Sequence, residues 1–391
     1  MDPMPLPFAD ARTITGAHVA LRDGLDPLVF NPGDPWHRPM NYPRVWTQLA
    51  RWGLREQHTP WLAAAFGLAL VLGLWRLRTL LRDRSTAWLL LLGVFAPTTW
   101  LALERANCDL LAFAILAAGI TVPLPHARAG ALLVTVAAML KVFPGVALAA
   151  FVAPSWRLTA HRLLPAALLF AVYLVLTLAD LPKMHAGTLS AHWISYGMVS
   201  LPTWIAKNTG APSWLPLFAA ALLLALLAAR TYRARLVTRL DDQQDPQLLA
   251  AFRAGAAVYL ASFAIGENFD YRLIFLLPTL PQLLRWSQRA PARLRRGAKI
   301  VTAMVLLLLW SQTWRQALAA AIGSPSLGIA IDEWLSWFAW LGLCTFTALS
   351  LPEWCVAKRH RGLPPVDCPP ALPRAALGHA IAAGKDRSVS A

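Results

Sequence analysis

The segment LFAAALLLALLAA, residues 217–229, carries no charged side chain. Two further charge-free runs occupy residues 88–94 and 304–310, and apolar neighbours extend all three towards the length of a bilayer span. A helix needs about 20 mostly apolar residues to cross the hydrocarbon core. Backbone groups in lipid must be hydrogen-bonded within the segment, so such spans are helical. These runs predict an all-α fold, a polytopic bundle of transmembrane helices.

The composition agrees with a membrane location. Of the 391 residues, 57% are hydrophobic and only 14% are charged, whereas a soluble domain is about a quarter charged. The net charge of +16 does not indicate a nucleic-acid partner, because the basic residues sit in short clusters between hydrophobic segments. Such clusters mark cytoplasmic loops, and they lie at 76–84, 157–162, 230–239, 285–299 and 358–361.

Charged clusters and Pro/Gly punctuation divide the chain into three parts. Residues 1–59 form an extracytoplasmic loop with a short amphipathic helix at 10–22, and Asp10 is expected to be its N-cap. Residues 60–350 form the transmembrane domain, with about 10–11 hydrophobic helices. Residues 351–391 form a disordered cytoplasmic tail. The expected apolar segments are 60–76, 86–103, 108–122, 129–140, 143–154, 163–179, 213–229, 250–266, 271–285, 299–319 and 333–350.

The segment 129–154 is expected to be a broken hairpin. Basic residues flank both of its ends, while Lys141 and Pro144 interrupt its middle. Each half reaches only about 15–18 Å, which is too short to cross the bilayer. A break at this depth is tolerated where protein or a polar cavity surrounds it. A single kinked span is the alternative interpretation.

With this hairpin, the predicted sides of the membrane alternate consistently. The Arg clusters fall inside, and residues 1–59, 104–107, 180–212, 267–270 and 320–332 fall outside. No signal peptide or apolar helix precedes residues 1–59 to carry them across. We therefore expect a first helix to be missing from this chain; unaided translocation of the loop is the alternative.

Ionisable side chains converge on the predicted outer face, where they mark a functional site by default. They come from the first loop, from the 104–109 turn, from the hairpin tip, from the 180–212 loop and from the 266–272 junction. Plainer roles are open for several of them. Glu104 and Arg105 could form a mutual ion pair, and the loop histidines could simply be solvated. With two asparagines beside the ionisable groups, the set comprises Asp10, Arg12, Glu104, Arg105, Asn107, Asp109, Lys141, His192, Glu267, Asn268, Asp270 and Arg272.

This set of side chains suits a substrate that is part lipid and part anion. The tail of a polyprenyl phosphate lies between helices, and its phosphate lies at the interface, where Arg and Lys can neutralise it. Transfer of a sugar from that phosphate to a hydroxyl needs a carboxylate base for the acceptor proton. The departing phosphate needs positive charge. No Gly-rich nucleotide loop or metal-type cysteine spacing is seen, so we expect neither cofactor nor metal.

Five short motifs in order resemble glycosyltransferase family 87, whose members are GT-C-type membrane enzymes that use polyprenyl-phosphate sugars. The resemblance extends from about residue 7 to residue 350. The motifs are Pro7-Phe8-Ala9-Asp10-Ala11-Arg12 with Gly24-Leu25-Asp26-Pro27, Asn41-Tyr42-Pro43, Glu104-Arg105-Ala106-Asn107-Cys108-Asp109, Leu140-Lys141-Val142-Phe143-Pro144 and Asn268-Phe269-Asp270-Tyr271-Arg272.

The resemblance implies specific roles. Asp10 corresponds to the catalytic acid of the first extracytoplasmic loop and is the expected general base of an inverting transfer. Arg105, Lys141 and Arg272 are the expected donor-phosphate contacts, and the rest of the set is expected to support them or the acceptor. The expected partners are a polyprenyl-phosphate sugar donor, a lipid or glycan acceptor and membrane lipids, in a bacterial inner membrane.

Two other functions compete with this prediction. The broken hairpin is also a device of transporters and lipid flippases, although the two halves of the chain show no convincing internal repeat. A non-catalytic protein of envelope assembly is the third possibility.

Overall fold

The computed structural model describes residues 6–188, 194–210, 212, 214–235 and 245–355. The described chain is helical almost throughout and has one two-stranded sheet, which confirms the all-α class. Of the described residues, those from 6 to 352 belong to one compact unit, which includes the segment up to residue 59, and 353–355 belong to a second. The expected disorder of the tail beyond residue 355 concerns residues outside the described ranges.

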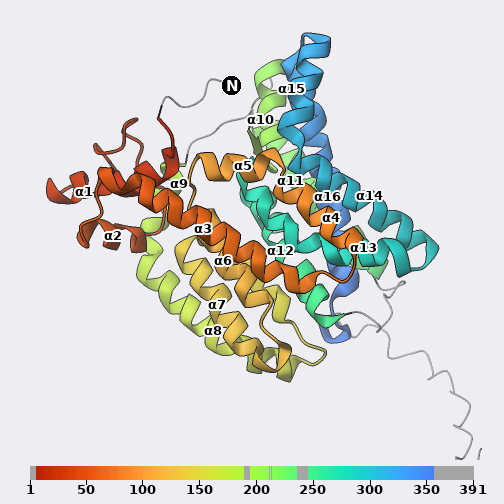
Figure 1. Cartoon of the computed structure of the whole chain (residues 1–391). Coiled ribbons are helices and arrows are strands. Elements are labelled where there is room, and N and C mark those ends of the chain that lie inside the picture. Colours follow the sequence, from red (N-terminus) through yellow and green to blue (C-terminus); the bar gives the residue numbers. More distant parts are fainter. Residues whose placement is uncertain (1–5, 189–193, 211, 213, 236–244, 356–391) are drawn as a thin grey trace, which may run out of the picture. The chain divides into compact units, whose positions relative to one another are not determined.

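Figure 1 labels the α-helices of the chain. The first half of the chain holds α-helices and short 3₁₀ helices (η). They are α1 (Ala9–Arg22), η1 (Arg44–Trp46), α2 (Thr47–Arg51), η2 (Glu56–His58), α3 (Thr59–Leu77), η3 (Arg78–Leu80), α4 (Arg84–Val94), α5 (Pro97–Glu104), α6 (Asp109–Ile120), η4 (Leu124–His126), α7 (Ala127–Leu140), η5 (Phe143–Phe151), α8 (Trp156–Thr177), η6 (Leu178–Asp180) and α9 (Leu181–Ala186).

The second half continues the helical pattern around a short sheet. Its elements are β1 (Ser195–Tyr196), α10 (Ser200–Thr209), α11 (Trp214–Arg235), α12 (Pro246–Ile265), β2 (Asn268–Phe269), η7 (Asp270–Thr279), α13 (Leu280–Arg289), α14 (Ala292–Leu309), α15 (Ser311–Ile322), α16 (Pro325–Ser350) and η8 (Glu353–Cys355).

Among the described residues, four helical segments are long and apolar enough to cross a membrane, and the number rises to seven if each of three bent pairs counts as one span. Two of these pairs correspond to expected single spans. The expected span 86–103 is divided into α4 and α5, which bend by 47°, and 299–319 falls within α14 and α15, which bend by 73°. Pro97 starts α5 after an extended residue, and because proline has no N–H group it cannot continue α4.

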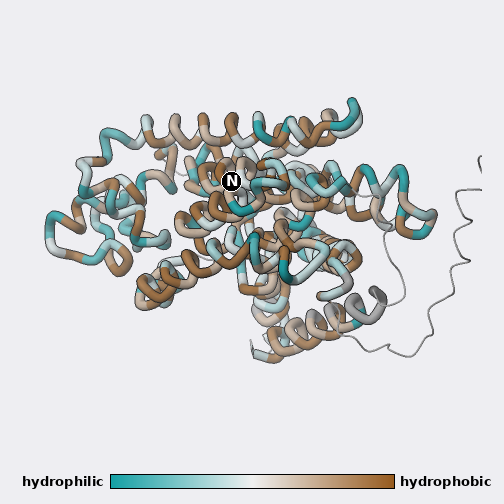
Figure 2. Tube along the Cα trace, turned by 90° about the horizontal axis from the view of Figure 1, so that it is seen from below, coloured by the Kyte–Doolittle hydropathy of each residue, from teal (hydrophilic) through white to brown (hydrophobic). Residues whose placement is uncertain are grey.

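The surface of the bundle is apolar, as a lipid-facing surface must be. On α3, Trp61 and Trp75 are 75% and 57% exposed, and tryptophans at both ends of a span are typical of membrane interfaces. The span that contains α8 is only 17% buried, whereas α12 is 67% buried and forms the centre of the bundle. Figure 2 shows hydrophobic residues along the helices and more hydrophilic ones in the α1–α2 region.

The predicted broken hairpin is present. α7 and η5 pack against each other with Lys141 and Val142 at the turn. At the other end, Arg128 Nε donates to the carbonyl oxygen of His161 in α8, at 2.8 Å. The first arm therefore starts, and the second arm ends, at the same end of the bundle. This excludes a single kinked span.

The second arm of the hairpin differs from the expectation of two α-helical halves. It is a 3₁₀ helix that ends at Phe151 rather than at residue 154. Its small buried residues Pro144, Ala147 and Ala150 recur every third position, which is the repeat of a 3₁₀ helix. This narrow face packs on α12.

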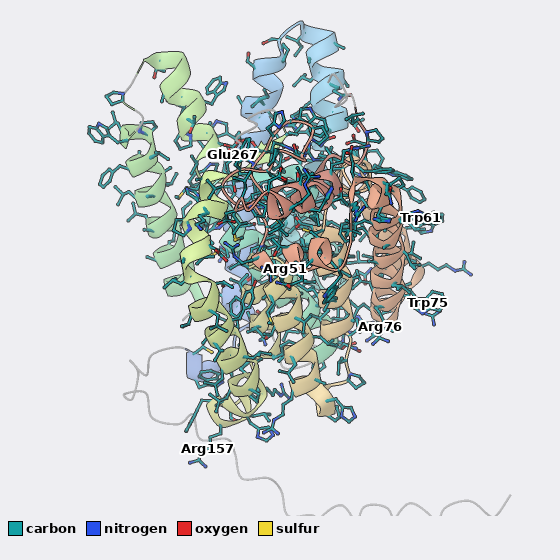
Figure 3. All side chains as sticks on the ribbon, turned by 90° about the vertical axis from the view of Figure 1, so that its left-hand side faces the viewer. Arg51, Trp61, Trp75, Arg76, Arg157 and Glu267 are labelled. Atoms are coloured by element: carbon teal, nitrogen blue, oxygen red, sulfur yellow. The ribbon has the colours of Figure 1, made fainter. Side chains whose placement is uncertain are left out.

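The two strands, β1 and β2, hold two loops together at the end of the bundle opposite Arg128 and His161. β1 pairs antiparallel with β2, so that Ser195 faces Phe269 and Tyr196 faces Asn268. The N–H group of Asp270 donates to the carbonyl oxygen of Ile194, at 2.8 Å. Figure 3 shows Glu267 of this region towards one end of the structure and Arg157 at the other.

α1 begins at Ala9, one residue before the expected start, and its N-cap position is Phe8. The expectation that Asp10 caps this helix is therefore wrong. The N–H groups of Phe8 and Asp10 donate to the carbonyl oxygens of Glu104 and Arg105, at 3.1 and 2.9 Å. The α5–α6 turn supplies acceptors for these N–H groups at the start of α1. The Asp10 side chain is therefore not needed as a helix cap and can bind other groups.

α6 and α7 cross at two glycines. A Cβ atom on Gly130 would lie 2.5 Å from the carbonyl oxygen of Gly119 and 2.9 Å from the Phe151 ring. Gly130→Ala should therefore force the helices apart and destabilise the fold by about 1–3 kcal/mol, measured as a loss of melting temperature in detergent. The control is Gly67→Ala on α3, where the nearest atom lies at 3.8 Å. Equal melting temperatures for the two variants would show that this crossing tolerates a methyl group.

Candidate functional site

Asp10 is the centre of a buried cluster of charges. Arg105 grips it through two hydrogen bonds, from Nε at 3.0 Å and from Nη2 at 2.8 Å. The side-chain amide of Asn107 donates to the same carboxylate at 2.6 Å. Arg38 Nη1 lies 3.6 Å from it, close enough for an ion pair but not for a hydrogen bond. Asp10 is only 4% exposed, so this charge is compensated by side chains.

Left-handed backbone places these groups. Within the described ranges, the non-glycine residues with positive φ are Phe8, His37 and Ala106. Phe8 lies two positions before Asp10, His37 precedes Arg38, and Ala106 separates Arg105 from Asn107. Residues other than glycine rarely adopt this conformation, and such strain persists where the surroundings enforce it, often at functional sites.

Arg38 is anchored from behind by a second carboxylate. Asp34 is fully buried and accepts from Arg38 Nη2 at 2.7 Å and from Nε at 3.0 Å. The Thr13 hydroxyl of α1 donates to Asp34 at 2.8 Å. The proline-rich loop is thus tied to α1, and the remaining nitrogen of Arg38, Nη1, faces Asp10.

The charges around Asp10 favour its ionised form. Burial alone raises the pKa of this carboxyl, but the Arg105 guanidinium, its hydrogen bonds, the Arg38 charge and the Asn107 amide lower that pKa below its ordinary value of 3.8. The carboxylate is therefore negatively charged at neutral pH. Burial is also the main cause that raises the pKa of the nearby Tyr42 hydroxyl well above 10.0, so Tyr42 stays protonated.

A second buried cluster surrounds Asp109, the first residue of α6. Lys141 at the hairpin turn lies 3.1 Å from one of its oxygens, and Arg272 lies 3.5 Å from the other. These contacts lack hydrogen-bond geometry, because both Asp109 oxygens and Arg272 Nε have no hydrogen-bond partner among the described residues. The attraction is therefore one of charge, and it draws α6, the hairpin and η7 together.

Asn107 and Tyr42 connect the two clusters. The Asn107 amide nitrogen reaches Asp10, and its oxygen accepts from the Asp109 N–H at 2.8 Å. The ring of Tyr42 lies 4.1 Å beneath the Lys141 ammonium, and its hydroxyl is 3.5 Å from Asn107. The joined network holds four cations against three carboxylates: Arg38, Arg105, Lys141 and Arg272 with Asp10, Asp34 and Asp109.

Other predicted site residues contact different partners. Asp270 turns towards α15, where Arg315 Nη2 donates to it at 2.8 Å, and Arg315 also pairs with Asp332 of α16. Glu267 accepts from the Ser195 hydroxyl at 2.6 Å. Asn268 is the exception, since it accepts from Arg272 and thus adjoins the Asp109 cluster.

Three further predictions have different outcomes. Arg12 points away from Asp10 and pairs with Glu56 at 3.1 Å. Glu104 is exposed, and its neighbour Arg105 pairs with Asp10, so the alternative of a mutual Glu104–Arg105 ion pair does not hold. His192 lies outside the described residues.

Arg38 and Asp34 were missed by the sequence reasoning, and Tyr42 was not assigned a role. Asp34 and Arg38 are separated by a proline, a tryptophan and a histidine within a polar loop, where an i, i+4 pair does not predict an ion pair as it does on a helix. One feature of the sequence could have indicated a site here. Charged and aromatic residues are denser between 34 and 44 than a simple linker needs.

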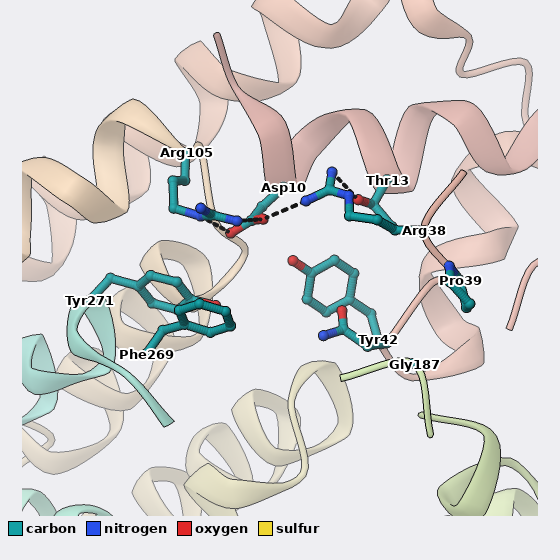
Figure 4. A pocket seen from close by; sticks show the side chains of 10 residues that line it. Asp10, Thr13, Arg38, Pro39, Tyr42, Arg105, Gly187, Phe269 and Tyr271 are labelled. Carbon is teal, nitrogen blue, oxygen red and sulfur yellow. Dashed lines mark hydrogen bonds and ion pairs between the residues drawn. The ribbon is translucent and has the colours of Figure 1, made fainter. Parts of the chain in front are cut away.

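A small cavity opens beside the Asp10 carboxylate. Its walls include Arg38 and Arg105, with Tyr42 across from Phe269 and Tyr271, as Figure 4 shows. Its volume is about 20 Å³, enough for about one water molecule. Phe269 and Tyr271 stack with ring centroids 5.4 Å apart, and Arg105 lies over both rings.

Comparison with family models, with curated proteins and with solved structures finds no match. The arrangement itself combines an ionised buried carboxylate with guanidinium groups around a cavity. A carboxylate of this kind can accept a proton once its partners release it, and guanidinium groups bind phosphate or carboxylate oxygens in pairs. Such a site can bind an anion beside a potential general base.

The Asp109 cluster predicts a large effect of neutralising Lys141. Lys141→Met leaves a fully buried carboxylate with less positive charge near it and should destabilise the fold by about 3 kcal/mol. The double variant Lys141→Met/Asp109→Asn should lose less than the sum of the single variants. Unfolding in a detergent titration measures this. The control is Lys183→Met, because Lys183 is 39% exposed beside Asp26; effects of equal size on both lysines would contradict a buried pair.

Asp26 predicts a dependence of stability on acid pH. Burial raises its pKa, but hydrogen bonds from Arg44 and Lys183 outweigh this and lower it from 3.8 to about 2. The ionised carboxylate therefore stabilises the fold above pH 3.8, and this contribution is lost as the pH falls towards 2. Melting temperature should fall over this window less in Asp26→Asn than in the wild type. Identical pH profiles would contradict the assignment.

Proposed function

We propose that this chain is a membrane glycosyltransferase that moves a sugar from a polyprenyl-phosphate donor to a hydroxyl of a lipid or glycan acceptor. The observation that supports this most is the buried Asp10 carboxylate, which lies among guanidinium groups at a cavity. The order of the five motifs that resemble glycosyltransferase family 87 is a second support. The reaction takes place on the extracytoplasmic face, in a bacterial inner membrane.

In the proposed step, Asp10 acts as the general base. Its carboxylate accepts the proton of the acceptor hydroxyl while that oxygen attacks the anomeric carbon of the sugar. The bond between this carbon and the phosphate oxygen breaks on the opposite side, and the phosphate leaves with the electron pair. The product has inverted configuration, and polyprenyl phosphate is released.

The cations near Asp10 have the complementary task. The leaving phosphate gains negative charge in the transition state, and pre-positioned guanidinium or ammonium groups stabilise it. Arg38 and Arg105 line the cavity, while Lys141 and Arg272 lie in the adjoining cluster around Asp109. Since the cavity is smaller than a sugar ring, its walls must separate when the donor binds.

The apolar surface of the bundle suits the rest of the donor. A polyprenyl chain can lie along the exposed faces of the spanning helices, and its phosphate can then reach the buried cluster from the membrane. Lys141 at the hairpin turn and Asp109 at the start of α6 occupy helix ends at this site. Irregular backbone at membrane depth is expected where it lines such a site.

Replacement of Asp10 tests this function. Asp10→Asn should reduce transfer by about a thousandfold, because the amide cannot accept the acceptor proton. The assay is transfer from a panel of polyprenyl-phosphate sugars in proteoliposomes, with the melting temperature as the check on folding. Asp23→Asn is the matched control, since Asp23 is exposed and pairs with its neighbour Arg22. Full transfer by a folded Asp10→Asn protein would remove Asp10 from the mechanism.

A further inference from the structure

Three hydrogen bonds from neighbouring side chains hold the Asp10 carboxylate. Its Oδ2 accepts from Arg105 Nε and from the Asn107 amide, and its Oδ1 accepts from Arg105 Nη2. A general base needs an oxygen within hydrogen-bond reach of the proton that it takes. In this arrangement the carboxylate binds guanidinium groups and is a poor base.

Arg38 and Arg105 nevertheless keep donors for another anion. Arg38 binds Asp34 and Thr13 through Nε and Nη2, so its Nη1 atom is held towards Asp10 without a hydrogen bond to it. Arg105 uses Nε and Nη2 on Asp10, and in the part of the chain that the structure describes no acceptor is found for its Nη1 atom. Both side chains line the cavity.

The other two cations are placed differently. Lys141 and Arg272 are not among the residues that line this cavity, and their carboxylate, Asp109, has no exposed surface. An anion that enters the cavity therefore meets Arg38 and Arg105 first. Once Arg105 leaves Asp10, it can donate two parallel hydrogen bonds to a phosphate from Nε and Nη2, and Arg38 can add a donor from Nη1.

We propose that Asp10 occupies the position of a phosphate group, so that a phosphate binding to Arg38 and Arg105 displaces Asp10 and thereby releases it to act as a base. The inference rests on the proposed function for the identity of the phosphate as that of the donor lipid. The competition itself is a property of this chain and is testable without any transfer reaction. It also adds Arg38 to the residues that contact the donor.

This mechanism couples binding to activation. The carboxylate becomes a base only when a phosphate has taken its guanidinium partners, so the catalytic group and the leaving group exchange the same cations. Asp10 therefore accepts the proton of the acceptor hydroxyl only while a donor is bound.

The test is phosphate binding by variants that weaken the internal competitor. Asp10→Asn removes the competing charge and should bind a short-chain prenyl phosphate about tenfold more tightly than the wild type, measured by calorimetry in nanodiscs. Arg38→Gln should lose most of this binding. Arg44→Gln is the matched control, because Arg44 pairs with Asp26 and Asp180 away from the cavity, and its affinity should equal that of the wild type.

A second variant keeps the test decisive if Asp10→Asn does not fold. Asn107→Ala leaves the Asp10 charge and both guanidinium groups but removes one hydrogen bond that holds the carboxylate, so it should also tighten binding, by a smaller factor. Unchanged or weaker binding in whichever of the two variants folds would overturn the proposal. So would tighter binding in Asp109→Asn alone, which would place the phosphate at Lys141 and Arg272.

The outcomes separate this inference from the proposed function. If Asp10→Asn tightens phosphate binding but the wild type transfers no sugar, the internal competition stands and the transferase function fails. If the wild type transfers sugar and neither variant tightens binding, the function stands and the competition is refuted. Inorganic phosphate, tested beside the prenyl phosphate, shows whether the site recognises the free anion or needs the lipid chain; tightening with either one supports the competition.

Discussion

The ion pair between Asp10 and Arg105 is the interaction on which the rest of the site depends. It joins α1, which precedes the candidate membrane-spanning helices in the sequence, to the turn between α5 and α6. A lone charge in such a buried position would be prohibitively costly, whereas a paired and hydrogen-bonded one is tolerated. Two backbone hydrogen bonds along the same contact fix the direction in which α1 leaves the turn. The remaining loops are arranged around this junction.

Much of the architecture was predictable because lipid imposes a simple constraint. The apolar runs, the hairpin turn at Lys141 and the location of the ionisable residues in a few short segments follow from the cost of exposed polar groups in hydrocarbon. The bends within 86–103 and 299–319 were not predicted, since hydropathy reports length but not direction. The 3₁₀ arm was not predicted because it is short and nearly all of its residues are apolar, so its three-residue repeat does not stand out in the sequence.

The pairing of the charges was harder to predict than their position. Sequence reasoning grouped Arg105, Lys141 and Arg272, yet the structure divides them between two carboxylates, Asp10 and Asp109. Which cation meets which acid depends on side-chain directions set by left-handed residues such as Ala106, and no periodicity reports these. Arg38 was missed for the same reason: its loop has no regular structure from which a direction could be derived.

One contact in the N-terminal segment bears on how the chain is assembled. The indole N–H of Trp46 donates to the carbonyl oxygen of Leu140, the last residue of α7, at 2.9 Å. This carbonyl, at the helix end, would otherwise lack an intrahelical donor. Because Trp46 is synthesised well before Leu140, the docking surface for the hairpin is already available when the hairpin leaves the ribosome. Translation thus produces the hydrogen-bond donor, Trp46, before it produces the acceptor, Leu140.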